Sequence, residues 1–299
     1  MPSLRDIRRR IRSIRNTAKI TKAMELVAAS RLRRAQMRVT AARPYAQAMR
    51  ALMAELGGLA PSGSEALHPL LTHREVRSVG VLLVTPDRGL AGALNTNIIR
   101  RGVEIILENE RGESQTVQVV TVGRKGQDFL ARRGRELTGT FTGIIDRVTY
   151  DDVIPIARVI IDSFVSGAID RAVLVYPRFV STLSQRPEMV QLLPIEPPEG
   201  AEATEQRQHL DYIFEPDPQS ILEELLPRYI EVQIYQAILE TAASFFSAQM
   251  VAMRNATDNA NDLVQSLSLT YNKVRQANIT REVTEIASAA EAMAASSRR

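Results

Sequence analysis

Hydrophobic residues at the start of the chain recur at alternating spacings of three and four. Such spacing forms the seam of a coiled coil rather than the broader stripe of a globular helix. We interpret the gap after Ala18 as a shift of register. The pattern predicts a helix over residues 1–57 that ends near Gly57-Gly58 and is kinked at Pro44. The seam consists of Leu4, Ile7, Ile11, Ile14, Ala18, Ala28, Leu32, Ala35, Val39, Ala42, Ala46, Met49, Met53 and Leu56.

A second long helix is predicted over residues 217–299. Asp217 before Pro218 is typical of an N-cap followed by a proline in the first turn, and Pro227 is expected to bend the helix. A second shift of register is expected after Ala277. The predicted seam consists of Met253, Ala256, Ala260, Leu263, Leu267, Thr270, Val274, Ala277, Ile279, Val283, Ile286, Ala290 and Met293.

Between these helices the pattern alternates between strand and helix. Strands are expected at 76–87, 116–123, 138–144, 172–179 and, as an antiparallel return, 181–195. Helices are expected at about 92–109, around Asp128 and at about 151–166. This order predicts an open, mainly parallel sheet covered on both faces, a small Rossmann-like α/β domain over residues 76–195. Residues 196–216, rich in Pro and Glu, are expected to form an acidic linker.

The lengths of the two helices decide how they pack. At 1.5 Å per residue the first spans roughly 80 Å and the second roughly 120 Å, whereas a domain of about 120 residues is only some 30 Å across. Neither helix fits into such a core. We therefore predict that the two helices pair as an antiparallel coiled coil. The α/β domain lies between these two helices in the sequence. The longer C-terminal helix should end in an unpaired tip, whose apolar stripe needs a partner.

Charge is concentrated at the N-terminal end. Residues 1–50 hold 14 Lys and Arg against 2 Asp and Glu, a net charge of +12, which leaves −8 for the other 249 residues of a chain at +4. Solvated helices mix charges of both signs, and this segment does not, so we expect an anionic partner surface. One cationic stripe consists of Arg5, Arg8, Arg12, Arg15, Lys19 and Lys22, and a second face consists of Arg31, Arg34 and Arg38.

Two other classes of function deserve comparison with this expectation. A coiled-coil scaffold that binds nucleic acid would use clustered cations, but no aromatic residue is interleaved before Tyr45. A nucleotide-dependent enzyme would use the sheet domain, but Gly89 and Gly92 give only GxxG, and the stretch from Gly123 to Gly126 is no phosphate loop either.

The residue types also argue against catalysis by this chain. It contains no cysteine, which excludes thiol catalysis, zinc–thiolate sites and disulfides. His68, His73 and His209 lack metal-ligand spacing and are expected to be exposed in loops. No nucleophile elbow occurs. We expect no catalytic residue, no metal ligand and no cofactor bound by the chain. No apolar run reaches 18 residues, so direct membrane insertion is not expected.

Three segments resemble a known family. They are RSIRNTAKITKAMELVAASRLRRAQ near the start, TPDRGLAGALNTN in the α/β domain, and MVAMRNATDNANDLVQSLSLTYNKVRQANITREVTEI near the end. Their sequence and order resemble the gamma subunits of rotary (F-type) ATP synthases. The resemblance implies a non-catalytic central-stalk rotor that turns inside a ring of three alpha and three beta subunits and couples transmembrane ion flow to ATP synthesis or hydrolysis.

The same resemblance implies the partners and the location. These are the alpha and beta subunits, the epsilon subunit and the c-ring, with Mg-ATP or Mg-ADP bound on beta. The chain would be a peripheral membrane protein on the cytoplasmic face of the bacterial inner (plasma) membrane. Residues implied to contact the ring are Lys19, Lys22, Met24, Arg31, Arg34, Arg38, Arg275, Gln276, Thr280, Glu282 and Glu285. The loop of Asp87, Arg88 and Gly89 is implied to lie near partner subunits.

This sequence departs from the family at two positions. Phe245 stands where the family usually has Glu, and Gln249 where it usually has Arg. Gln249 is expected to lie across the coiled coil from Met24. Contacts that the family makes through those two charged side chains are therefore not expected here.

Overall fold

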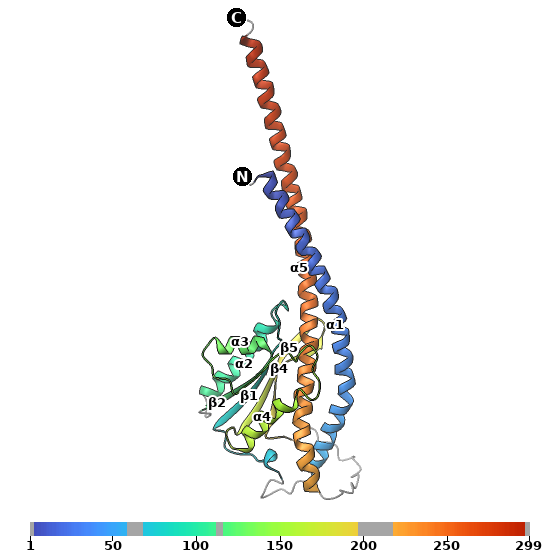
Figure 1. Ribbon diagram of the computed structural model, residues 1–299, viewed down its shortest axis with the longest axis vertical. Coiled ribbons are helices and arrows are strands. Elements are labelled where there is room, and N and C mark those ends of the chain that lie inside the picture. Colours follow the sequence, from blue (N-terminus) through green and yellow to red (C-terminus); the bar gives the residue numbers. More distant parts are fainter. Residues whose placement is uncertain (1–2, 59–67, 112–115, 197–217, 297–299) are drawn as a thin grey trace. The chain divides into compact units, whose positions relative to one another are not determined.

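The computed structural model describes residues 3–58, 68–111, 116–196 and 218–296. Two long helices, α1 (Leu4–Gly58) and α5 (Pro218–Ser296), precede and follow the α/β segment (Figure 1). Both remain continuous through their internal prolines, and the bends expected there stay predictions. The expected N-cap at Asp217, His209 and all but the first residue of the acidic linker lie outside the described residues.

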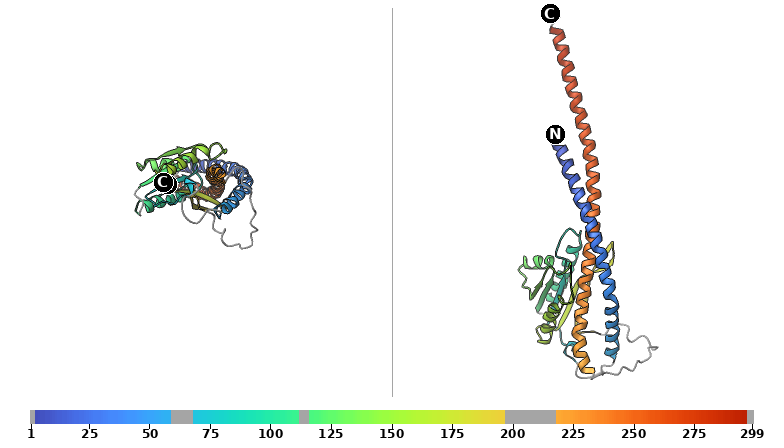
Figure 2. Two further views of the ribbon diagram at one scale, coloured as in Figure 1. Left: turned by 90° about the horizontal axis from the view of Figure 1, so that it is seen from below. Right: turned by 45° about the vertical axis from the view of Figure 1, so that its right-hand side comes forward.

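The chain divides into two compact units. One comprises residues 28–249, and the other comprises residues 1–27 with 250–299. Each long helix therefore contributes one part to either unit. Figure 2 shows both helices from two further directions.

The unit of residues 28–249 contains one five-stranded sheet. Its order is β3-β2-β1-β4-β5, with β1, β2, β3 and β4 parallel and β5 antiparallel to β4. This confirms the open, mainly parallel sheet with an antiparallel return strand. The strands are β1 (Ser78–Val84), β2 (Thr116–Val122), β3 (Gly139–Phe141), β4 (Arg171–Ser181) and β5 (Ser184–Leu193).

Three helices connect the parallel strands. They are α2 (Leu94–Arg111), α3 (Arg124–Ala131) and α4 (Ile154–Val165), and a short 3-10 helix, η1 (Pro69–Leu71), precedes β1. Right-handed crossovers from β1 to β2 to β3 place α2 and α3 on one face, and the return from β3 to β4 places α4 on the other. All three helices occur where the sequence predicts them, with ends shifted by a few residues.

The core of this unit surrounds β1. All seven of its residues are buried because β2 and β4 pair with its two edges and helices cover both faces. Gly102 of α2 lets this helix approach closely, since a Cβ there would lie 2.8 Å from Cδ1 of Leu83. Within this unit, the part of α1 from residue 28 to residue 53 buries most of its predicted seam. The buried seam residues are Ala28, Leu32, Ala35, Val39, Ala46, Met49 and Met53.

The expected shift of register in α1 is wrong. Thr21 is buried, and Glu25 has a side chain only 14% exposed, paired with Lys22 at 3.0 Å. These two polar residues fill the positions between Ala18 and Ala28 at unbroken spacings of three, four and three. Because a hydrophobic pattern skips polar residues, a continuous seam looked interrupted.

Beyond Ala260 the seam predicted for α5 is confirmed only at Leu267 and Val274, which are half-buried. Leu263 is 48% exposed, and Thr270 and Ala277 are exposed as well. The half-buried positions that were not predicted are Val264, Ser268, Tyr271 and Asn278. The Tyr271 hydroxyl accepts a hydrogen bond from Arg8 at 2.9 Å, which explains why this large polar residue takes an inward position that Thr270 does not.

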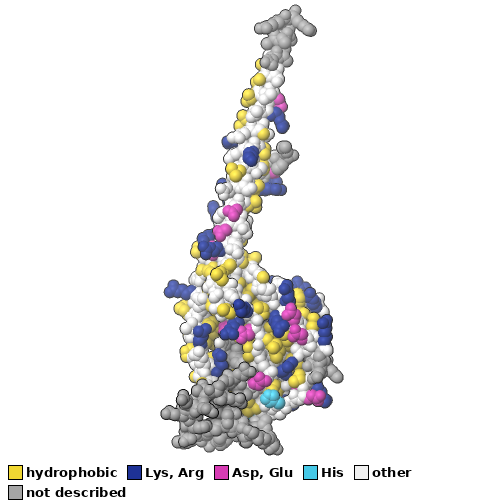
Figure 3. All heavy atoms as spheres, turned by 180° about the vertical axis from the view of Figure 1, so that it is seen from behind, with side chains coloured by type: hydrophobic (Ala, Val, Ile, Leu, Met, Phe, Trp, Pro, Cys, Tyr) yellow, Lys and Arg dark blue, Asp and Glu magenta, His cyan; other side chains and the backbone are white. Residues whose placement is uncertain are grey.

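Residues 279–290 of α5 are exposed on every side. Figure 3 shows hydrophobic side chains in yellow along this part of the helix, and Ile279, Val283 and Ile286 are 51%, 59% and 70% exposed. None of the described helices combines the length and the apolar character needed to cross a membrane.

A buried hydroxyl pair joins the two helices of the smaller unit. The Oγ1 atoms of Thr21 and Thr257 lie 2.7 Å apart, and each also lies within hydrogen-bond reach of a carbonyl of its own helix. Thr21→Val should lower local stability by about 0.5–1.5 kcal/mol because the Thr257 hydroxyl loses its bond across the helix pair and keeps only the Met253 carbonyl of its own helix. Thr21→Val with Thr257→Val should cost less than the sum of the single changes.

Native-state hydrogen exchange of residues 18–25 measures this coupling. Thr17→Val is the matched control, because Thr17 is exposed and its hydroxyl donates only to Ser13 in its own helix. Additive effects of the two buried changes would contradict the pairing.

Candidate partner interface

The loop from β1 to α2 is held in an uncommon backbone conformation. Leu90 has φ of 64° and Gly92 has φ of 56°, both in the left-handed region. For Leu90 this conformation costs roughly 1–2 kcal/mol. Its side chain is nevertheless 63% exposed, so the strain presents an apolar residue to solvent. Asn95 fixes the start of the loop by donating to the Arg88 carbonyl at 3.0 Å.

Asp87, which follows β1, connects the carboxyl ends of three parallel strands by hydrogen bonds. Its Oδ1 accepts the N–H of Arg124, which follows β2, and the N–H of Gly143, which follows β3, both at 3.0 Å. This edge is where open α/β sheets bind ligands. Here a carboxylate of the chain itself takes the N-terminal N–H of α3.

Thr85 completes this arrangement. Its buried Oγ1 accepts the N–H of Gly126 at 2.8 Å, and Gly123 passes so close that a Cβ there would lie 1.7 Å from the Thr85 carbonyl oxygen. Gly123 has φ of 93°, so both space and conformation require glycine. The stretch from Gly123 to Gly126 therefore serves close packing of α3 against β1.

Arg88 and Arg31 share one carboxylate. Arg88 pairs with Asp146, and Arg31 lies 3.8 Å from the same carboxylate. The Arg31 guanidinium also lies 5.7 Å from the ring centre of Phe246. These contacts join α1 to the loop after β1 and to the loop after β3.

The structure brings predicted residues from two segments together. Arg31, Arg34, Arg38, Arg88 and Arg147, which we call the basic cluster, line a pocket of about 410 Å³ in which Asp146 is the only carboxylate. Arg34 and Arg38 are exposed. Sequence reasoning missed Asp146 and Arg147, because a single Asp-Arg pair in a loop carries no periodic signal. The excess of positive charge suits a carboxylate-rich surface.

The first cationic stripe belongs to the smaller unit. All six of its residues are exposed. Lys22 pairs with Glu25, and Arg8 bonds Tyr271. Within the ranges that the structure describes, Arg5, Arg12, Arg15 and Lys19 form no ion pair. Most of this stripe is therefore available to an external anion.

The remaining predicted contact residues are accessible but isolated. Met24 and Gly89 are half-buried, whereas five residues of α5 lie exposed. Among those five, the Thr280 hydroxyl donates to the Gln276 carbonyl of its own helix. Their partner contacts stay predictions. The five are Arg275, Gln276, Thr280, Glu282 and Glu285.

The exposure of two histidines and of the two positions that depart from the family differs from residue to residue. His68 is not fully exposed: its Nδ1 accepts the N–H of Leu70 and caps η1, and burial lowers its pKa. His73 is exposed as expected. Phe245 is 2% exposed and packs against Phe246 with ring centres 5.3 Å apart, so its site is apolar in this chain. Gln249 is half-buried.

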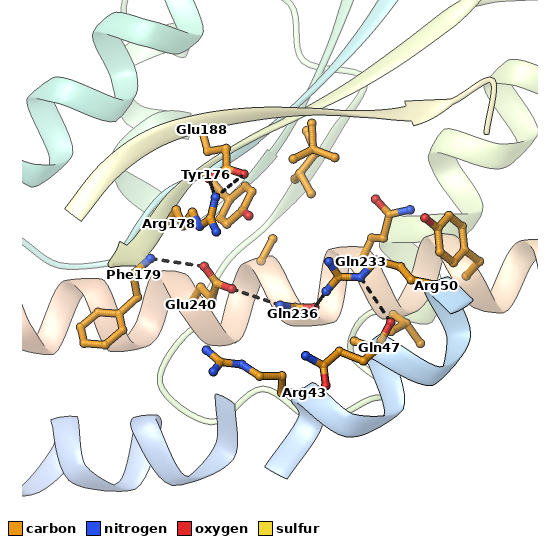
Figure 4. A pocket seen from close by; sticks show the side chains of 16 residues that line it. Arg43, Gln47, Arg50, Tyr176, Arg178, Phe179, Glu188, Gln233, Gln236 and Glu240 are labelled. Atoms are coloured by element: carbon orange, nitrogen blue, oxygen red, sulfur yellow. Dashed lines mark hydrogen bonds and ion pairs between the residues drawn. The ribbon is translucent and has the colours of Figure 1, made fainter. Parts of the chain in front are cut away.

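A second pocket lies between α1, α5 and the sheet. It measures about 530 Å³ and is lined by three arginines, Arg43, Arg50 and Arg178, and two glutamates, Glu188 and Glu240 (Figure 4). Glu188 pairs with Arg178 at 3.1 Å. Burial raises the pKa of Glu240, and hydrogen bonds from Gln236 and the Phe179 N–H partly oppose this shift. Nowhere in the described ranges do three or more Asp, Glu or His gather as a metal site would require.

Comparison with known proteins identifies the class to which this fold belongs. A family model described as ATP synthase matches residues 3–293. Chains in the structures of the Tetrahymena thermophila mitochondrial ATP synthase central stalk and c-ring and of the Euglena gracilis mitochondrial ATP synthase rotor share the fold. Their TM-scores are 0.60 and 0.62, at 23% and 19% identity, covering 79% and 92% of this chain and 99% and 98% of theirs.

A sequence relative specifies the family. The ATP synthase gamma chain of Roseiflexus sp. (strain RS-1) is 49% identical over 295 residues, which cover 98% of this chain and 99% of the relative. The chain therefore belongs to the family of ATP synthase gamma chains. This confirms the resemblance stated from the three sequence segments, and the alternative of a nucleic-acid-binding scaffold receives no support.

Asp87→Ala tests whether this carboxylate holds the strand ends together. Losing two hydrogen bonds to a charged acceptor should lower the free energy of unfolding by about 1–3 kcal/mol. Urea denaturation measures the change. Asp151→Ala is the control, since Asp151 is exposed and forms no hydrogen bond or ion pair with the residues that the structure describes. Equal stability of the two variants would contradict the role of Asp87.

Glu240→Gln tests the raised pKa. A carboxyl whose pKa is higher in the folded state stabilises most below its ordinary value of 4.5 and loses that contribution as pH rises through the raised pKa. Glu240→Gln, which stays neutral, should therefore gain in Tm relative to the original chain as the pH rises above 4.5. Glu224→Gln, at a side chain 77% exposed, gives the baseline for losing one charge. A gain that shrinks with pH would contradict the raised pKa.

Proposed function

We propose that this chain is the central-stalk rotor of an ATP synthase. It would couple transmembrane ion flow to ATP synthesis or hydrolysis by turning inside a ring of alpha and beta subunits. The observation that carries the proposal is the match to a gamma chain over nearly the whole of both sequences. The solved chains of the same fold belong to assemblies described as central stalk and rotor, which supports the same role.

The exposed cations supply a physical basis for contact with the ring. The basic cluster and the first cationic stripe present more positive charge than Asp146 and Glu25, the acidic residues paired with them, neutralise. An acidic surface on the ring that faces these residues would be attracted over about a Debye length. Coupling requires that the rotor contact the conformations of a catalytic site differently, and charge carried on only part of a turning helix meets that requirement.

The rotor itself would be non-catalytic. Catalytic sites and Mg-ATP or Mg-ADP would belong to the partner beta subunits, with no cofactor bound by this chain. The N–H of Arg124 and the N–H of Gly126, which face the edge where open sheets bind phosphate, are bonded to Asp87 and Thr85. This internal bonding supports a structural role for the edge.

The remaining partners and the location follow from the same role. The epsilon subunit and the c-ring would join the α/β domain. The complex would place the chain as a peripheral protein on the cytoplasmic face of a bacterial inner membrane. The exposed tip of α5, with Ile279, Val283 and Ile286, would be covered by the ring.

Neutralising Arg31, Arg34 and Arg38 to Gln tests the charge contact. In complexes assembled with alpha and beta chains from the same source, the triple variant should weaken coupling between ATP hydrolysis and ion pumping while leaving the fold intact. ATPase activity and ATP-driven pumping in vesicles are measured together, and circular dichroism checks the fold. The effect should grow at low ionic strength, where exposed charges are least screened.

A triple change of Arg100, Arg111 and Arg132 to Gln is the matched control. These arginines are exposed, as Arg34 and Arg38 are, but lie on α2 and after α3. Unchanged pumping per ATP in the first triple variant would remove the basic cluster from the mechanism. Failure of the unaltered chain to assemble with alpha and beta would overturn the rotor proposal itself.

A further inference from the structure

The end of β4 extends beyond its parallel neighbour. β1 pairs with β4 only as far as Val175, whereas β4 continues to Ser181 alongside β5. From Tyr176 onward, one edge of β4 therefore has no strand beside it. Backbone groups on such an edge need other partners when they are shielded from water. Pro177 lacks an N–H, which leaves one donor fewer to satisfy.

Helix α5 supplies these partners from its side chains. The carboxylate of Glu240 accepts the N–H of Phe179 at 3.3 Å, and the hydroxyl of Ser244 donates to the Pro177 carbonyl at 3.0 Å. Pro177 and Phe179 are two residues apart, so their groups point to the same side of the strand. Figure 4 shows the bond from Phe179 to Glu240 beside the second pocket.

A third hydrogen bond joins α5 to the turn between β4 and β5. The hydroxyl of Ser247 donates to the Thr182 carbonyl at 2.6 Å. Gln185 of β5 donates to the Thr182 carbonyl at 3.1 Å and lies 3.4 Å from the Ser247 hydroxyl. The turn between β4 and β5 is thus fixed to the helix as well.

These three α5 residues lie on one face of the helix and are buried. Spacings of four and three place Glu240, Ser244 and Ser247 above one another. Their exposed fractions are 7%, 0% and 0%. Polar side chains at such depth are unfavourable unless they are hydrogen-bonded, so their bonds to β4 account for their presence among apolar neighbours.

The hydrogen bonds between α5 and the end of β4 resist sliding of the two elements past each other. Apolar packing is non-directional, so two apolar surfaces resist separation better than they resist sliding. Hydrogen bonds at fixed atoms resist sliding because their geometry is lost within a fraction of an ångström. The hydrogen bonds from Glu240, Ser244 and Ser247 of α5 therefore fix the position of the β4–β5 hairpin along the helix and around it.

We propose that Glu240, Ser244 and Ser247 form a latch that fastens the unpaired end of β4 to α5, so that the α/β domain and this helix turn as one body. The proposal rests on the rotor function proposed above, because only a rotor must carry torque between these parts. The latch is a positioning device and contacts no substrate.

The first measurement follows the latch bonds directly. Hydrogen exchange of the Phe179 amide in the assembled complex should accelerate about five-fold in Glu240→Ala, as expected for one lost hydrogen bond. Glu240→Gln keeps an acceptor at the same place and should restore protection. If Glu240→Ala does not fold, Ser244→Ala with Ser247→Ala tests the same latch through the hairpin amides.

The second measurement follows torque. Because the chain has no cysteine, Ala131→Cys at the exposed end of α3 gives a unique attachment point for a bead on the α/β domain. In complexes stalled by bound nucleotide, Ser244→Ala with Ser247→Ala should widen the angular distribution of the bead. Thr241→Val is the control, since the buried Thr241 hydroxyl bonds only Ala237 of its own helix.

The outcomes separate the two proposals. A wider distribution in the double variant, with Thr241→Val unchanged, supports the latch. Faster exchange with an unchanged angular distribution would make these bonds merely structural and overturn it. If the unaltered chain neither assembles nor rotates, the rotor proposal fails, and the latch proposal falls with it.

Discussion

Burial of α5 is the constraint on which the rest of the structure depends. A helix of 79 residues cannot be covered by one small core, and its surroundings change along its length. Residues up to 249 face the sheet and α1 and are buried on several sides. Residues 250–278 keep one stripe that is buried as far as Ala260 and half-buried beyond it, and residues 279–290 are exposed to solvent among the described residues. The sequence follows this gradient, since isoleucines and phenylalanines around Ile238 and Phe245 give way to Asn, Gln and Ser farther along.

Elements with a strong period could be predicted from the sequence, and polar positions inside them could not. The strands of the mainly parallel sheet and both long helices follow from runs of Val, Ile and Leu and from the heptad spacing. Thr21, Glu25 and Tyr271 escaped prediction because each is polar yet faces inward, where a partner on the neighbouring helix or turn satisfies it. The partners of Thr21 and Tyr271 come from a distant segment, which a local pattern does not contain. Glu25 pairs with Lys22 of the same helix, but a pattern of hydrophobic positions does not register an ion pair.

The candidate interface was predictable only in part for a related reason. Arg31, Arg34 and Arg38 stand out because they repeat along one helix, and Arg88 stands in a segment that resembles the family. Their convergence around Asp146 depends on where the loop after β3 returns, which spacing along the chain does not encode. The latch of α5 was equally hidden, because Ser and Glu in a helix are usually solvent-facing residues.

The hydroxyl pair of Thr21 and Thr257 also bears on slippage between the helices of the smaller unit. Displacing α5 by one heptad would set Thr21 against Val264 and leave its buried hydroxyl facing an apolar side chain. A heptad seam of Ala, Ile and Leu tolerates several alignments almost equally well, whereas a buried polar pair penalises all but one. The two small hydroxyls therefore specify the register of the helix pair and give it a single preferred alignment.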